Sequence, residues 1–314
     1  MSSAIVTFVV VNWNGKHLLE QSIPSIMEQT YPSFEVIVAD NGSSDGSLEY
    51  LRGFPEVQVI EMPENRGYGG PNNLAFEKAR GEWIATVNND MVLDPDWLRH
   101  LVRAIESDAA CFSVQGRNLK LGESGVIDGC GIGLRPCGAA RRLYHNRSDA
   151  PISGEPIPIF AASSGAALYR KQMLAEIGYF DASYFIYYED LDAGWRARLK
   201  GWHSKMVPQA VSSHRVHATS RAGGGELLWY LGERNRLRTL IKNLPLGAAL
   251  RHPFLIGLDE LRYLSMVRRN VKARTLVKAR VDVVKEILSL WRKRPADLKN
   301  RGEREWLEWL ALCA

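Results

Sequence analysis

The chain has 314 residues, of which 46% are hydrophobic and 24% are charged. This composition predicts a globular protein with a large core and excludes a mainly disordered chain. The net charge of +5 is unevenly spread: residues 226–314 hold 19 lysines and arginines against 10 acids, and residues 1–225 hold 21 against 25. The basic character belongs to the last third, which argues against nucleic acid as a partner.

Cysteine usage and the first residues bear on the compartment. The four cysteines have no C-x-x-C spacing and no histidine cluster nearby, so we expect a reducing compartment and no zinc site. Residues 4–11 form an apolar run without a basic stretch before it, which we interpret as a strand, not a signal peptide. No apolar run approaches the roughly 20 residues of a membrane-spanning helix. We therefore expect a cytoplasmic protein.

Strand and helix patterns alternate in the first hundred residues. Strands are predicted at residues 4–11, 34–39, 57–61 and 82–87. Helices are predicted after the first strand, at 46–52, at 72–80 and from 94–95 onward. This alternation is typical of an α/β domain with a mainly parallel sheet. No G-x-G-x-x-G motif follows the first strand, which disfavours a dinucleotide-binding fold.

The remaining chain shows fewer regular patterns. Residues 109–169 are rich in glycine and proline, and helices are expected at 171–177 and 189–200 with a short strand at 204–211. From residue 226 onward the chain is predicted to form helices rich in leucine, arginine and lysine. We divide the chain into a domain of residues 1–225, with halves of about 1–108 and 109–225, and a basic helical region of residues 226–314.

Polar side chains follow several predicted strands and are expected to converge. Because ligands of such sheets bind beyond the carboxyl ends of the strands, Asn12, Asp40, Asn65 and residues 88–90 should share one edge. Asp40 suits contact with a nucleotide base or ribose, although the sequence after it is also typical of a turn.

The stretch Asn88-Asn89-Asp90 carries one acid at a strand end. One carboxylate can suffice for Mg²⁺, which keeps several waters and takes further oxygens from substrate phosphates. Asn88 can bind a ribose hydroxyl as donor or acceptor. Asparagine and aspartate also dominate turns, so a purely structural role is the alternative.

The loop Asn65-Arg66-Gly67-Tyr68-Gly69-Gly70 has glycines that let the backbone approach a ligand. Arg66 can contact a phosphate, and the predicted helix start at Asn72 can support an anion. The alternative is a flexible loop with a capping asparagine.

Two further stretches carry titratable groups. Tyr187-Tyr188-Glu189-Asp190-Leu191-Asp192 places acids among aromatic residues at a predicted helix start, where one of them can act as a general base. The alternative is helix capping, or for Asp192 a pair with Arg196 four residues later. His214 and His217 follow a predicted strand and indicate metal ligation or contact with phosphate.

Six stretches occur in order along residues 4–240: V-V-N-W-N-G at 10–15, D-N-G-S-S-D-G-S at 40–47, N-R-G-Y-G-G at 65–70, N-N-D at 88–90, G-Y-F-D at 178–181 and Y-E-D-L-D at 188–192. Together they resemble the inverting family 2 glycosyltransferases of GT-A fold, especially the bacterial rhamnosyltransferase-like branch. The resemblance implies a mixed, mainly parallel sheet with a helical extension, a nucleotide-sugar donor such as a dTDP- or UDP-sugar, and Mg²⁺ or Mn²⁺ as cofactor.

The resemblance also implies residue roles. Asp190 is expected to deprotonate the acceptor hydroxyl, with Glu189 as the first substitute. Asp90 and His214 are expected to hold the metal, with His217 as the alternative to His214. Many family members have aspartate where this chain has Asn88, which bears on metal affinity. The expected nucleotide-sugar contacts are Asn12, Asp40, Asn65, Arg66, Gly67, Asn72, Asn88, Asn89 and Gly165.

Residues 226–314 are expected to add no chemistry. Apolar side chains among many cations predict helices that lie on an anionic membrane surface, at the inner face of the cell membrane. The alternative is packing on the catalytic domain or in a homodimer. Because the family often uses lipid-linked acceptors, a glycan or polyprenyl-linked acceptor is expected.

Two other functions are alternatives to an enzyme of this class. A non-catalytic sugar-nucleotide or glycan-binding module can keep the fold, but the Glu189-Asp190 pair and His214 favour catalysis. A nucleotidyltransferase requires a glycine-rich loop with basic residues after the first strand, and residues 12–16 supply a poor one.

Overall fold

The N-terminal apolar run forms the central strand β1 (Val6–Asn12), which is buried along nearly its whole length. It lies between β2 (Phe34–Asp40) and β4 (Trp83–Asn88), and both neighbours run parallel to it. Strand β3 (Val57–Glu61) pairs with β2 in the same direction. The computed structural model describes residues 5–148, 152, 154–215, 225–299 and 303–312.

The sheet continues on the other side of β4 with strands from the second half of the domain. Its order is β10-β12-β6-β11-β4-β1-β2-β3, with β5 paired to β12 and β7 paired to β6. Strand β11 is antiparallel to β4 and β6, whereas β12 is parallel to β6. The predicted mixed, mainly parallel sheet is therefore confirmed. The added strands are β5 (Met91–Leu93), β6 (Cys111–Lys120), β7 (Ile127–Gly129), β10 (Ile157–Ile159), β11 (Ala166–Arg170) and β12 (His203–His214).

Helices cover both faces of the sheet because successive strand residues point to opposite sides. Phe8 of β1 lies in a core cluster with Trp97, on the side of α1 and α4. Its neighbour Val9 lies in a second cluster with Phe76 and Phe180, on the other side. The helices of the domain are α1 (Lys16–Met27), α2 (Ser47–Leu51), α3 (Gly69–Lys78), α4 (Trp97–Glu106), α5 (Lys171–Glu176) and α6 (Glu189–Leu199).

Several predicted boundaries differ from those observed. Helix α3 starts at Gly69 and not at Asn72, and α4 starts at Trp97, after the predicted proline start. The irregular region contains β6, whose buried polar residues interrupt the apolar pattern of a strand. At Gly116 a side chain would overlap the backbone oxygen of Ala210, so this glycine lets β6 and β12 approach closely.

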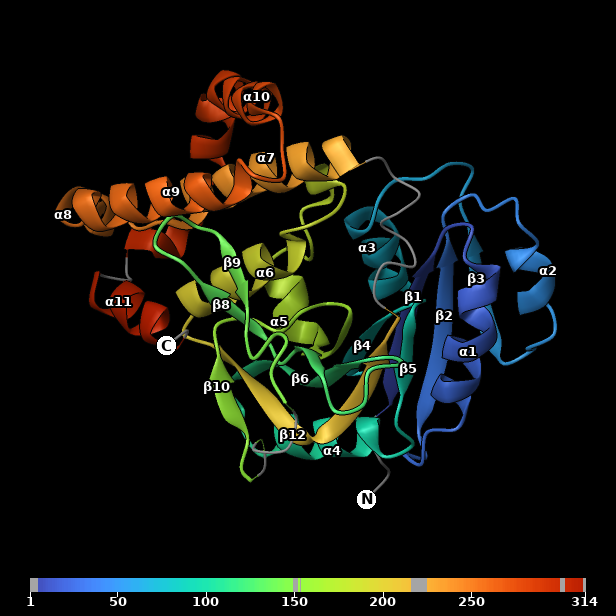
Figure 1. The fold of residues 1–314 in the computed structure, drawn as a ribbon. Helices are drawn as coiled ribbons and strands as arrows, with labels where there is room; N and C mark the ends of the chain where they lie inside the picture. The colour runs from blue at the N-terminus through green and yellow to red at the C-terminus, as the bar shows by residue number, and fades with distance from the viewer. Residues whose placement is uncertain (1–4, 149–151, 153, 216–224, 300–302, 313–314) are drawn as a thin grey trace.

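The C-terminal region shares a core with the domain. Trp306 is buried in a cluster that includes Trp195 of α6, and α7 contacts both α6 and α10. Figure 1 shows α7 to α9 as a layer above α5 and α6, with α10 on the outer side of α7. Among the described residues, no helix is long and apolar enough to cross a membrane. The elements are α7 (Gly225–Asn243), α8 (Leu246–Arg251), α9 (Pro253–Val267), α10 (Ala273–Arg292) and α11 (Glu303–Ala311), with a β-hairpin of β8 (Ile132–Leu134) and β9 (Ala140–Arg142) beneath them.

Candidate active site

The ends of β1 and β2 place two predicted nucleotide contacts side by side. Asn12 and Asp40 are register partners, and both are buried. The Asn12 amide nitrogen donates to Oδ2 of Asp40 at 3.0 Å and to Oγ of Ser43 at 3.2 Å. The backbone nitrogen of Ser43 donates to the other Asp40 oxygen at 2.8 Å. Asp40 is thus fixed at the strand end, and each of its oxygens can accept one further hydrogen bond.

Asn89 is tied into this cluster from the neighbouring strand end. Its amide nitrogen donates to Oδ1 of Asn12 at 2.8 Å. A side chain at Gly15 would overlap the Asn89 amide, so a glycine is needed there for close packing. Asn89 therefore joins the ends of β4 and β1 in addition to its predicted contact role.

Asn88, the last residue of β4, has an unsatisfied polar atom. Its backbone nitrogen donates to the oxygen of Gly165 at 2.8 Å, which joins it to the segment before β11. Its side-chain Oδ1 is buried and has no hydrogen-bond partner in the structure. A side chain at Gly165 would crowd the Asn88 amide at 3.4 Å. Oδ1 of Asn88 could therefore accept a hydrogen bond from a hydroxyl group of a ligand bound at the end of β4.

Asp90 and His214, the predicted metal ligands, lie together. His214 Nε2 is 3.3 Å from Oδ2 of Asp90, and His214 Nδ1 is 2.9 Å from Oδ2 of Asp128. Burial disfavours the charged imidazole, but the hydrogen bonds to Asp128 and Asp90 outweigh it and raise the pKa of His214 to about 9. Asp128 itself is buried and also bound by Arg142 at 2.9 Å.

This arrangement matches the chemistry of a metal site that is completed by substrate. A histidine ligand commonly has its second ring nitrogen held by a carboxylate, which is the role Asp128 occupies. Metal binding at Nε2 would replace the proton there. In the part of the chain that is described, no group of three or more His, Cys, Asp and Glu side chains is arranged to hold a metal ion. Asp90 and His214 supply two ligand side chains, so a cation there would need further oxygens, such as those of a diphosphate. His217 lies outside the described residues.

The glycine-rich loop is held by a residue that sequence analysis missed. Asn41 donates its amide nitrogen to the oxygen of Gly67 at 2.6 Å and to Asn65 Oδ1 at 3.2 Å. Its own Oδ1 accepts from the backbone nitrogen of Arg66 at 3.0 Å. The Arg66 side chain is exposed and lies 3.5 Å from Glu64. Arg66 can therefore turn toward a ligand without breaking a buried contact.

Asn72 does not stand at a helix start, which corrects the predicted anion site. It is buried within α3, and its amide nitrogen donates to the Tyr68 oxygen at 2.9 Å. The helix starts three residues earlier, at Gly69, where a side chain would crowd the backbone of Ala182 at 3.3 Å. Asn72 Oδ1 is buried without a hydrogen-bond partner.

The acid pair at the start of α6 lies beside the segment that precedes β11. The backbone nitrogen of Ser164 donates to Oδ2 of Asp190 at 3.2 Å, and that of Leu191 donates to Oδ1 at 2.7 Å. Glu189 is buried, and its Oε2 has no hydrogen-bond partner. Burial and then the charge of Asp190 raise the pKa of Glu189 to about 8, and burial raises the pKa of Asp190. The two N–H donors favour the charged form of Asp190, whereas burial and the neighbouring charge favour the protonated form of Glu189.

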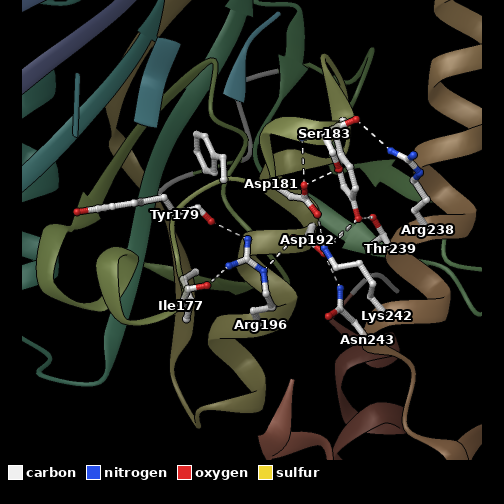
Figure 2. A network of polar contacts seen from close by, with 12 residues as sticks. Ile177, Tyr179, Asp181, Ser183, Asp192, Arg196, Arg238, Thr239, Lys242 and Asn243 are labelled. Atoms are coloured by element: carbon white, nitrogen blue, oxygen red, sulfur yellow. Dashed lines mark hydrogen bonds and ion pairs between the residues drawn. The ribbon is translucent and has the colours of Figure 1, made fainter. Parts of the chain in front are cut away.

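Asp192 belongs to a separate, structural network, shown in Figure 2. It accepts from Arg196 Nε at 2.8 Å, which confirms the alternative of a pair four residues apart. From α7, Asn243 donates to it at 2.8 Å and Lys242 lies 3.0 Å away. Although burial opposes the charge, Lys242 and Arg196 lower the pKa of Asp192. Its ionised side chain fixes α6 against α7.

The mixed sheet and its covering helices have the GT-A fold, which similar solved structures share. The solved structure of S. aureus TarS 1–349 in complex with UDP-GlcNAc has a TM-score of 0.63 and 19% identity, over 90% of this chain and 81% of that one. That of GalNAc-T7 with UDP, GalNAc and Mn²⁺ has a TM-score of 0.63 and 17% identity, over 76% and 48%. At these identities the likeness concerns the fold.

The chain belongs to glycosyl transferase family 2, whose family model matches residues 7–178. Succinoglycan biosynthesis protein ExoO of Rhizobium meliloti (strain 1021) is 32% identical over 126 residues, which cover 37% of this chain and 36% of that protein. Poly-beta-1,6-N-acetyl-D-glucosamine synthase of Staphylococcus aureus (strain COL) is 20% identical over 209 residues, covering 66% and 48%. The match thus spans about a third to a half of the length of these relatives.

Proposed function

We propose that this protein transfers a sugar from a nucleotide-diphosphate donor, a UDP- or dTDP-sugar, to a hydroxyl of a glycan or lipid-linked acceptor, with inversion. The main support for this proposal is the position of the acid pair, Glu189 and Asp190. Asp190 accepts from Ser164, the residue before Gly165, and Gly165 bonds Asn88 at the end of β4. The carboxylate of Asp190 is therefore linked through Ser164 and Gly165 to Asn88, the proposed ribose contact.

The proposed roles on the donor side follow from the contacts. Asp40 and Asn12 are buried and mutually bonded, so Asp40 has free acceptor capacity for a base N–H. The orphaned Oδ1 of Asn88 accepts from a ribose hydroxyl. The Arg66 side chain is exposed and can bind a phosphate of the donor. Together these groups bind the nucleotide with the sugar directed toward Gly165 and Asp190.

The proposed reaction is a single displacement. The acceptor oxygen forms a bond to the anomeric carbon while the bond from that carbon to the diphosphate oxygen breaks. The acceptor proton passes to Asp190, and the leaving nucleotide diphosphate takes the electron pair. Attack from the face opposite the leaving group inverts the anomeric centre. General-base assistance of this kind is typically worth about 10²–10⁴-fold in rate.

Asp90 and His214 would hold Mg²⁺ or Mn²⁺, with Asp128 orienting the His214 ring through Nδ1. When bound, such a cation stabilises the negative charge on the leaving diphosphate as a Lewis acid. A similar fold was solved with Mn²⁺ in GalNAc-T7, which supports a divalent cation here. Because Asn88 is neutral where many family members have an acid, Asp90 supplies the carboxylate.

The relatives support a role in polysaccharide biosynthesis of the cell envelope, since one is named for succinoglycan and another for poly-N-acetylglucosamine. A UDP-sugar is favoured as donor by the TarS structure with UDP-GlcNAc. The rhamnosyltransferase-like motifs favour a dTDP-sugar. We propose one of these two donor classes, with a hexosyl or rhamnosyl group transferred in the cytoplasm.

We also propose that α8 to α10 lie on an anionic membrane surface, where a lipid-linked acceptor would be presented. Phe254 is 90% exposed and Leu250 is 70% exposed, on neighbouring helices α8 and α9. On α10, Leu288 is 73% exposed. The net charge of +9 on residues 226–314 would attract anionic lipids to the region that carries these exposed apolar side chains. A homodimer through the same helices is the competing arrangement.

A screen of nucleotide sugars tests the proposed function. The protein is incubated with UDP-, dTDP- and GDP-sugars in Mg²⁺, in Mn²⁺ and in chelator, and release of nucleotide diphosphate is measured. Release from one UDP- or dTDP-sugar that depends on the cation is expected. Nucleotide binding without release from any sugar, with acceptor extracts present, would favour the non-catalytic binding module. Release of pyrophosphate from a nucleoside triphosphate and a sugar phosphate would favour the nucleotidyltransferase.

A further inference from the structure

The segment before the acid pair has a strained backbone. Phe185, Tyr187 and Tyr188 have φ angles of 68°, 70° and 75°, which side-chain-bearing residues rarely adopt. The backbone nitrogen of Ile186 donates to the oxygen of Tyr184 at 2.9 Å, with Phe185 at φ 68° and ψ −62°. This is the rare, strained form of γ-turn. Such a backbone persists only where the surroundings fix it.

One side of this segment is fixed by the glycine-rich loop. The backbone nitrogen of Tyr68 donates to the oxygen of Phe185 at 2.5 Å. At Gly67, with φ of 76°, a side chain would overlap the backbone of Phe185. The proposed donor loop and the segment before the acids are therefore in direct contact.

The other side is fixed by Asn235 of α7. This residue is completely buried, although the helix lies in the basic C-terminal region. Its amide nitrogen lies within hydrogen-bond distance of three backbone oxygens, those of Tyr184 at 2.9 Å, Ile186 at 2.8 Å and Tyr187 at 3.0 Å, so its two N–H groups are shared among them. These oxygens span the strained turns. Asn235 therefore binds the backbone conformation itself and not one particular side chain.

Other groups of α7 extend the same contact. Arg234 donates to the oxygens of Ser183 and Tyr184 at 3.3 Å and 3.1 Å, and Arg238 donates to that of Ser183 at 3.0 Å. Lys242 lies 2.8 Å from Asp181, at the start of the segment, as Figure 2 shows. The helix thus holds the chain continuously from residue 181 to residue 187.

We propose that Asn235 is a positioning residue for the sugar transfer: it holds residues 184–188 in the strained conformation that presents Glu189 and Asp190 to the acceptor. The inference rests on the proposed function of the acid pair. It assigns part of the active-site architecture to the C-terminal region, which the sequence predicted to be without chemistry. Asp190 does the proton transfer, and Asn235 acts through the backbone that precedes it.

The test compares Asn235→Ala with Arg236→Lys, each in the full-length chain. Arg236 is equally buried on the same helix, but within the described residues its hydrogen bonds go to Glu233 at 2.9 Å, Glu260 at 2.8 Å and the backbone oxygen of Cys137, and not to the backbone of residues 184–188. Asn235→Ala is expected to lower kcat about 10–100-fold at an unchanged KM for the donor, because a misplacement of about 1 Å can cost 10²-fold. Arg236→Lys is expected to lower Tm with kcat within about twofold.

A second readout does not depend on turnover. Hydrogen exchange of the backbone amides of residues 184–191 is expected to be faster in Asn235→Ala and unchanged in Arg236→Lys. If Asn235→Ala does not fold, Asn235→Ser, which keeps one donor, takes its place. When Tyr187→Gly is combined with Asn235→Ala, part of the lost kcat is expected to return, because glycine adopts positive φ without strain.

Wild-type kcat and wild-type exchange in a folded Asn235 variant would overturn the proposal. An equal loss of kcat in the two helix variants would also overturn it, since the effect would then be general destabilisation. Asp190→Asn is measured alongside. Wild-type turnover in that variant would refute the proposed base, whereas faster exchange in Asn235→Ala would still report on the backbone contact.

Discussion

The imidazole of His214 lies 3.3 Å from the carboxylate of Asp90, although 124 residues separate them in the sequence. The contact arises because β12, which ends at His214, pairs with β5, which directly follows Asp90. On its other side the ring is held by Asp128 at 2.9 Å. A strand pairing thus brings together the two groups that we propose to hold a cation, and a third residue orients one of them.

Asp128→Asn is predicted to weaken binding of Mn²⁺ about 10–100-fold, the usual effect of removing an outer carboxylate from a histidine ligand. Asparagine keeps the size of the side chain and removes its charge. Titration calorimetry of Mn²⁺ into protein with bound UDP measures the Kd directly. Asp108→Asn is the control, because Asp108 binds another histidine, His203 at 2.8 Å, outside the proposed site. Equal Mn²⁺ affinity in Asp128→Asn and wild type would contradict the assigned role of Asp128.

Asn88→Ala is predicted to remove discrimination between ribose and deoxyribose. The orphaned Oδ1 of Asn88 needs a donor, and a hydrogen bond of this kind is worth about 0.5–1.5 kcal/mol, or roughly 2–10-fold in Kd. Wild type should bind UDP more tightly than its 2′- or 3′-deoxy analogue, and the variant should bind both equally. Asn73→Ala, which removes a contact to Phe180 within the protein, should keep the discrimination. If Asn88→Ala keeps it too, the ribose contact lies elsewhere.

Glu189→Gln is predicted to stabilise the protein increasingly from about pH 5 to pH 8. The pKa of Glu189 is raised from its ordinary value of 4.5 to about 8. Between these values the folded protein holds a proton that the unfolded chain releases, so the free energy of unfolding falls as the pH rises. Glutamine does not titrate and avoids this loss. The Tm difference at pH 8 should reach several degrees, since 1 kcal/mol corresponds to about 2–4 °C in larger domains.

Thermal unfolding of both proteins at pH 4.5, 6 and 8 gives this comparison. The exposed Glu64→Gln is the control and should show no such trend. A Tm difference that stays constant over the pH range would mean that Glu189 ionises normally in the folded protein.

The exposed apolar side chains of α8 and α9 are predicted to drive membrane binding. Phe254→Ser combined with Leu250→Ser should reduce pelleting with vesicles that contain anionic lipid by about tenfold, because two exposed apolar side chains that would insert into the membrane are lost. Wild type should pellet less with purely zwitterionic vesicles. The exposed Val277→Ser on α10 gives a single-site comparison. Pelleting that does not change with anionic lipid content would contradict a membrane role. If wild type has the mass of two chains in solution and the double variant has the mass of one, the homodimer would be favoured.

The donor half was predictable because its signals are local. Strands β1, β2 and β4 are largely apolar runs that end in polar residues, so the sequence pattern alone places Asn12, Asp40 and Asn88 at one edge of the sheet. The acceptor half was less predictable, since β6 is a buried strand with polar residues and lacks the apolar pattern. The start of α3 was misjudged because glycines, which usually end helices, begin this one.

The residues that support the site were missed for a physical reason. Asp128 and Asn41 act through contacts distant in the sequence: Asp128 stands outside the six family stretches, and Asn41 stands in one of them without a sign of its contacts to the loop. Asn235 lies in the basic region that was predicted to lie on an anionic membrane surface and to add no chemistry. Only the packing of α7 against residues 181–188 reveals that several of these polar residues are buried.

The most direct test of the account measures the rate and stereochemistry of sugar transfer by wild type and Asp190→Asn. The donor is the one identified by the screen, and proton NMR of the product gives the anomeric configuration. We predict an inverted anomeric configuration and a loss of at least roughly 10²-fold in kcat for Asp190→Asn, with the Kd for nucleotide unchanged. A retained anomeric configuration, or turnover of Asp190→Asn near that of wild type, would contradict the proposed base and mechanism.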